Sequence, residues 1–78
     1  MGSIKFKNDI AYHRKNKKLS QNDLSKILDI DRPTLSKFEN GHILPSKDLL
    51  ESIAKNLNVL ISDLYSLELQ KIILREKI

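Results

Sequence analysis

Apolar residues recur every three or four positions through much of this chain, which is the spacing of amphipathic helices. The clearest case follows Ser20, where Leu24, Ile27 and Leu28 are expected to give a short helix one apolar face. Ser20 and Asp23 have the spacing of a capping box, in which each side chain binds the other residue's backbone N–H. We therefore expect this helix to begin directly after Ser20.

A second short helix is predicted after a few turn residues. Asp31 is expected to cap it, and Pro33 suits its first turn, where the backbone nitrogen lacks a partner anyway. Leu35 and Phe38 share its inward face. Gly41 is expected to end it, because glycine readily takes the left-handed conformation found just after a helix.

The same periodicity predicts the remaining elements as helices over residues 6–17, 47–57, 59–65 and 66–78. We therefore expect an all-α fold. Residues 1–5 are expected to be a flexible N-terminus, residues 6–65 a compact domain of five helices, and residues 66–78 an extra C-terminal helix.

The positive charge of the chain is concentrated in one half of it. The net charge is +4; residues 1–40 hold nine Lys or Arg and five Asp or Glu, and residues 41–78 hold five of each. The excess lies in the half that contains the two short helices, which favours a polyanionic partner such as nucleic acid. A solvated lysine-rich face is the alternative.

Several other classes of function lack the residues that they need. There is no cysteine for a disulfide or a thiolate metal site. His13 and His42 have no acidic ligands at metal spacing, so we expect no metal and no other cofactor. No glycine-rich phosphate loop or catalytic triad is apparent, so we expect no catalytic residue and no enzyme activity. Apolar runs are too short for a membrane span or a signal peptide, so we expect a cytoplasmic protein without a membrane partner.

The chain contains the stretch RKNKKLSQNDLSKILDIDRPTLSKFENG, followed by LPS, LLESIAKNLNV and SDLY. These segments resemble the lambdoid repressor and Cro-type family, often called XRE-like, over roughly Phe6–Tyr65. The resemblance implies a repressor-like DNA-binding domain with its helix-turn-helix at about residues 20–40. The second helix of that motif would then enter the major groove of DNA.

A helix in the groove directs its N-terminal residues toward the base edges. The residues expected to contact bases are Arg32, Pro33, Thr34 and Lys37. The residues expected to contact backbone phosphates are Gln21, Ser36, Asn40 and His42. Arg32 has the planar fork that matches guanine. For Thr34 the alternative is local, since its hydroxyl can also cap its own helix.

The resemblance also implies an ion pair between Arg14 and Glu39, which would join the first helix to the recognition helix. Two unrelated surface charges are the alternative. Exposed ion pairs contribute only about 0–1 kcal/mol, so we expect little stabilisation from it.

The function implied is that of a sequence-specific transcriptional regulator, a repressor or autoregulator, that binds a palindromic operator as a homodimer. The dimer interface is expected to comprise Leu60, Ile61, Tyr65, Leu69, Ile72 and Ile73. Two alternatives remain for the tail: it folds back on its own domain, or it awaits a partner. The alternative function is a protein-interaction module of the same fold, such as an antitoxin that holds a toxin.

Overall fold

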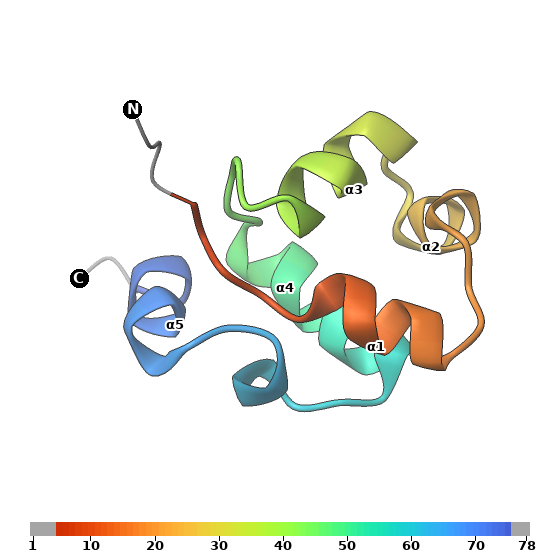
Figure 1. Ribbon diagram of the computed structural model, residues 1–78. Helices are drawn as coiled ribbons and strands as arrows, with labels where there is room; N and C mark the ends of the chain where they lie inside the picture. Colours follow the sequence, from red (N-terminus) through yellow and green to blue (C-terminus); the bar gives the residue numbers. More distant parts are fainter. Residues whose placement is uncertain (1–4, 76–78) are drawn as a thin grey trace.

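The computed structural model describes residues 5–75, and in this range it contains five α-helices, one 3-10 helix and no strand. The elements are α1 (Ile10–Asn16), α2 (Gln21–Leu28), α3 (Arg32–Glu39), α4 (Lys47–Leu57), the 3-10 helix η1 (Ile61–Asp63) and α5 (Leu67–Ile73). Figure 1 shows α1 to α4 grouped around a common centre, with α5 on the side of the molecule opposite to α2. The all-α prediction is confirmed.

One hydrophobic core joins these elements. Its most deeply buried side chains are Ile10, Leu24, Leu35, Leu50, Ile53, Leu57 and Leu64. They come from α1, α2, α3, α4 and the residue that follows η1. Burial of one such side chain contributes about 1.5–3 kcal/mol, so Leu35 and the neighbouring Phe38 hold the inner face of α3 on this shared core.

The caps of α2 and α3 form as predicted. Ser20 Oγ accepts from the Asp23 backbone N–H at 2.9 Å, and Asp23 Oδ2 accepts from the Ser20 N–H at 2.9 Å. Asp31 Oδ1 accepts from the Thr34 N–H at 3.0 Å. Gly41 follows α3 with a φ of +78°, the left-handed conformation that glycine adopts without steric cost. These local signals fix where the two short helices begin and end.

The inner face of α2 differs from the prediction. Ile27 is 49% exposed, although its spacing placed it with the apolar residues. Leu24 and Leu28 are buried, and the small Ser25 is buried beside them, with its hydroxyl donating to the Asn22 carbonyl at 2.9 Å. Because α2 is short and lies at the edge of the bundle, only a narrow stripe of it reaches the core.

The first helix is four residues shorter at its start than predicted, because residues 5–9 form an extended segment, which we call the N-terminal strap. The Phe6 N–H donates to the Gly41 carbonyl at 2.9 Å, and the Asp9 N–H donates to the Leu64 carbonyl at 3.0 Å. The strap therefore runs between the end of α3 and the end of η1 (Figure 1). Phe6 is consequently not on the same helix as Ile10.

Asn8 explains why the helix starts late. Its Oδ1 accepts from the Ile10 N–H at 3.0 Å, so Asn8 occupies a backbone donor of the first turn of α1. Its Nδ2 donates to the Phe38 carbonyl at 2.8 Å and to the Phe6 carbonyl at 3.0 Å. One side chain thus starts α1 and fastens it to the end of α3.

The predicted fifth helix over residues 59–65 is a single 3-10 turn. Leu60 precedes it, is 69% exposed, and has no side-chain oxygen with which to cap it. Asp63 compensates in part, because its Oδ2 accepts from the Leu60 N–H at 2.8 Å. One such bond does not support a longer helix here.

The last helix, α5, is also shorter than predicted, and it packs partly on its own domain. Leu69 and Ile73 are half-buried against the core, whereas Ile72 is 59% exposed. Tyr65 is only 2% exposed, so the expectation that it lies on an accessible patch is wrong. Of the predicted flexible N-terminus (residues 1–5), residues 1–4 lie outside the described residues, as do residues 76–78, including Ile78, of the predicted C-terminal helix.

Candidate nucleic-acid interface

The outward face of α3 carries the residues predicted to contact bases. Arg32, Pro33 and Lys37 are exposed and Thr34 is half-buried. Figure 1 shows α3 at the outer edge of the bundle, with no other helix packed on its outer side. Positions four apart on a helix share a face, so Pro33 and Lys37 lie on the same side of α3. A row of cationic and apolar groups is thus presented outward.

The predicted phosphate contacts lie at both ends of this face. Gln21 is half-buried at the first position of α2, whereas Asn40 and His42 are exposed after α3. Asn40 Nδ2 donates to Ser36 Oγ at 3.1 Å, which leaves the Ser36 hydroxyl hydrogen free to donate elsewhere. The His42 backbone N–H is used within the molecule, on the Lys37 carbonyl at 2.9 Å, so only its side chain remains for a ligand.

Arg14 and Glu39 form a two-bonded ion pair beneath the interface. Arg14 Nε lies 2.7 Å from Glu39 Oε2, and Arg14 Nη2 lies 3.1 Å from Glu39 Oε1. The side chains are only 9% and 5% exposed, so the pair is buried and the assumption of an exposed pair is wrong. Arg14 Nη1 also donates to the Leu19 carbonyl at 2.9 Å. The end of α3 is thereby tied to α1 and to the segment that leads into α2.

Gln21 extends this pair to the start of α3. Its Nε2 donates to Glu39 Oε1 at 2.9 Å, and its Oε1 accepts from Arg32 Nη1 at 3.2 Å. The amide can have only this orientation, because a carboxylate only accepts and a guanidinium only donates. The result is a continuous chain from Arg14 through Glu39 and Gln21 to Arg32.

The two bonds made by Gln21 were not predicted from the sequence. Gln21 and Arg32 are the first residues of α2 and α3 and lie eleven positions apart, so no helical spacing pairs them. The partners of Gln21 depend on where Glu39 and Arg32 lie in the folded chain.

Two carboxylates near the interface stay ionised over a wide pH range. Hydrogen bonds from the side chain and then the backbone of Thr34 hold the pKa of Asp31 below its ordinary value of 3.8. The backbone N–H and then the hydroxyl of Ser20 lower the pKa of Asp23 in the same way. Both negative charges lie at helix N-termini, where the helix dipole favours them. The outward face of α3 therefore carries the negative charge of Asp31 beside Arg32.

The part of the chain that the structure describes, residues 5–75, holds no group of three or more His, Asp or Glu that could bind a metal ion. None of its helices has both the length and the apolar content needed to cross a bilayer. Of the predicted dimer residues, Leu60 and Ile72 are exposed, whereas Ile61, Leu69 and Ile73 are partly buried against the core of their own chain.

A family model described as helix-turn-helix matches residues 10–64, which include α1 through η1 and exclude α5. An uncharacterized HTH-type transcriptional regulator from Methanocaldococcus jannaschii is 39% identical over 63 residues, covering 81% of this chain and 96% of that protein.

Solved structures show the same architecture. The crystal structure of the clp gene regulator ClgR from Corynebacterium glutamicum superimposes with a TM-score of 0.65 at 24% identity over 69% of this chain. The match spans 57% of the ClgR chain, which is less than two thirds of its length. The hypothetical transcription factor NHTF from Neisseria gives a TM-score of 0.66 at 26% identity, covering 82% of this chain and 74% of that one.

Proposed function

The chain belongs to the helix-turn-helix family of the lambdoid repressor and Cro type, and from this premise we propose that it is a sequence-specific transcriptional regulator that represses from a palindromic operator. It is a DNA-binding regulator and not an enzyme. The observation that carries the proposal is the outward face of α3, which presents Arg32 and Lys37 while the rest of α3 is held by the core. A cytoplasmic location is part of the proposal, since the partner is DNA.

Base reading is assigned to the N-terminal half of α3. Arg32 is exposed at the first position of the helix, and its fork can donate to O6 and N7 of one guanine. Lys37 lies farther along the exposed side and reaches a second base pair. Pro33 and Thr34 supply apolar contact to a thymine methyl group. Asp31, which stays ionised beside them, disfavours any pose that brings a phosphate close to the start of α3.

Phosphate binding is assigned to the flanks of that face. Gln21 has one Nε2 hydrogen left after its bond to Glu39, and this hydrogen can donate to a phosphate oxygen. Ser36, Asn40 and His42 would hold the backbone near the other end of α3. Such contacts set the register of the protein on DNA but do not read sequence.

A homodimer completes the proposal, because one short helix reads few base pairs. Two copies would place their α3 helices in half-sites about 34 Å apart, one turn of the double helix. Leu60 and Ile72 are 69% and 59% exposed, and Leu67 of the same helix as Ile72 is 65% exposed. Exposed apolar side chains of this kind are what a shared interface would cover.

The experiment that tests this function is selection of bound duplexes from random DNA by the full chain, at about 150 mM salt, where nonspecific binding is screened. We expect enrichment of a two-fold symmetric site with half-sites about 10 base pairs apart. The matched control is Lys55→Ala, an exposed residue on α4 away from the proposed face, which should enrich the same site. Failure to enrich any sequence would contradict the proposal.

A further inference from the structure

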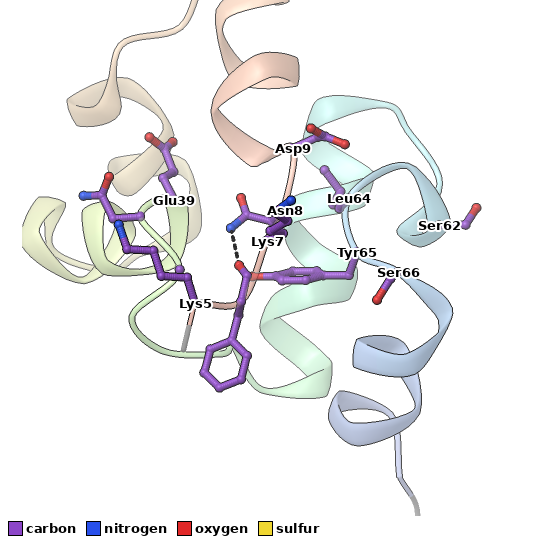
Figure 2. A pocket seen from close by; sticks show the side chains of 12 residues that line it. Lys5, Lys7, Asn8, Asp9, Glu39, Ser62, Leu64, Tyr65 and Ser66 are labelled. Carbon is purple, nitrogen blue, oxygen red and sulfur yellow. Dashed lines mark hydrogen bonds between the residues drawn. The ribbon is translucent and has the colours of Figure 1, made fainter. Parts of the chain in front are cut away.

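A pocket lies between the N-terminal strap, the end of α3 and the connection from η1 to α5. It has a volume of about 740 Å³, and its lining includes Lys5, Phe6, Lys7, Leu64 and Tyr65 (Figure 2). Sites for small molecules usually have volumes of about 300–1,000 Å³. Asn40, a proposed phosphate contact, also lines the pocket, but the residues proposed to read bases, Arg32, Pro33, Thr34 and Lys37, do not.

Tyr65 carries a hydrogen-bonding group that nothing in the described chain satisfies. The residue is 2% exposed, and its hydroxyl is a buried polar atom without a hydrogen-bond partner among residues 5–75. Buried hydroxyls nearly always have a partner, and phenylalanine would fill the same space without this cost. Figure 2 shows the Tyr65 ring directed toward the strap that carries Lys5 and Lys7.

The chemistry around Tyr65 favours a ligand that accepts hydrogen bonds. Burial raises the pKa of Tyr65 to about 12, so its hydroxyl stays protonated and can donate at neutral pH. Lys5 and Lys7 are exposed cations on the strap. Of the two acidic residues in the lining, Glu39 is already neutralised by Arg14, and only Asp9 opposes the two lysines. The free groups are thus mainly donors with a net positive charge.

We propose that this pocket binds a small organic carboxylate. Its apolar body lies against the half-buried Phe6, and its carboxylate accepts from the Tyr65 hydroxyl and from the strap lysines. Because the hydroxyl is covered, the carboxylate reaches it when the strap shifts outward. The hydroxyl then gains the partner that it lacks in the free protein.

Such a shift of the strap would disturb the bonds that it makes to the end of α3. The Phe6 N–H is bonded to the carbonyl of Gly41, the residue that closes α3, and a Cβ on Gly41 would lie only 3.0 Å from the Phe6 nitrogen. Asn8 of the same strap is bonded to the Phe38 carbonyl within α3. Occupation of the pocket should therefore change DNA affinity, a consequence that rests on the proposed function, whereas the binding itself does not.

The test is an NMR titration of the full, nitrogen-15-labelled chain with benzoate, with benzyl alcohol as the neutral probe of similar shape. We expect saturable shifts of the Phe6, Gly41 and Ser66 amides with benzoate, and at least about tenfold weaker binding of benzyl alcohol. Tyr65→Phe should weaken benzoate binding by about tenfold to a hundredfold, the effect of one hydrogen bond to a charged group. Tyr12→Phe removes a hydroxyl from a residue that is 63% exposed, and should leave the affinity unchanged.

Two results would overturn the proposal: no shift at these amides with benzoate up to about 10 mM, or equal benzoate affinity in Tyr65→Phe. The same spectra show whether each variant is folded. Anisotropy titrations on the selected operator, with and without benzoate, then test the coupling. Benzoate should change DNA affinity at lower concentrations in the unmodified chain than in Tyr65→Phe, by the factor that separates their benzoate affinities. Operator binding without benzoate tests the proposed function separately, and an unchanged affinity with benzoate bound would overturn the coupling alone.

Discussion

Gln21 Oε1 accepts a hydrogen bond from Arg32 Nη1 at 3.2 Å, so the first residue of α2 holds the first residue of α3. The same amide donates to Glu39 at 2.9 Å, and Glu39 is paired with the buried Arg14. The side chain proposed to read guanine is therefore positioned in the free protein. Positioning of this kind lowers the entropy that an arginine loses when it binds.

Replacement of Arg32 by alanine should reduce binding in a base-dependent way. We expect a loss of about 1–3 kcal/mol on the preferred site and a relaxed preference at one base pair. Anisotropy titrations on matched and singly substituted sites measure both effects. Equal losses on every sequence would instead assign Arg32 to a phosphate.

Replacement of Gln21 by alanine should weaken binding on all sequences, because its proposed partner is a phosphate. The slope of log affinity against log salt should barely change, since glutamine is neutral. The bond to Arg32 adds a further expectation: a double-mutant cycle of Gln21→Ala and Arg32→Ala should show a coupling of at least about 0.5 kcal/mol on the preferred site. Additive losses would show that Gln21 does not position Arg32 on DNA.

The ion pair between Arg14 and Glu39 should matter for folding, because it is buried. Glu39→Ala leaves the Arg14 charge buried without its partner, and should lower the free energy of unfolding by about 3–5 kcal/mol in urea titrations. Glu51→Ala removes an exposed glutamate from α4 and should change it by no more than about 0.5 kcal/mol. The double variant Arg14→Met, Glu39→Met should be more stable than Glu39→Ala. A cost for Glu39→Ala as small as the control would contradict this account.

The stability of the domain should fall in acid. The folded-state pKa of Asp31 lies below 3.8, so the stabilisation that its charge provides is present above about pH 3.8 and is lost as the pH falls through the lower folded value. Asp31→Asn retains a helix-capping side chain but does not titrate. Melting temperatures between pH 5 and 2.5 should therefore fall less steeply in Asp31→Asn than in the unmodified chain. Parallel curves would show that Asp31 contributes nothing to the acid dependence.

Dimerisation should depend on the exposed apolar side chains rather than on the whole tail. Leu69 and Ile73 pack against the core of their own chain, so truncation after Tyr65 would also damage the fold. We therefore expect Leu60→Glu with Ile72→Glu to give a folded monomer in light scattering, with much weaker binding to a palindrome. Lys71→Glu adds a negative charge at an exposed neighbouring position of α5 and should remain dimeric. A doubly substituted chain that stays dimeric would place the interface elsewhere.

The sequence determined the elements whose signals are local. The capping box of Ser20 and Asp23, the cap at Asp31 and the turn at Gly41 act through residues three or four apart, so α2 and α3 form where they were predicted. The membership of the family follows from the same segment. The same segment also predicts which residues of α3 point outward, because the helical period separates inward from outward positions.

Only the tertiary structure decided what depends on residues distant in sequence. Asn8 starts α1 at Ile10 because it binds the carbonyl of Phe38, thirty positions away. The link from Gln21 to Glu39 and the burial of the Arg14 pair require α1, α2 and α3 to be packed together. Tyr65 was predicted to lie in the dimer interface, yet it is buried in its own chain. Such outcomes depend on which residues come into contact when the chain folds, and the spacing of residues along the sequence does not specify these long-range contacts.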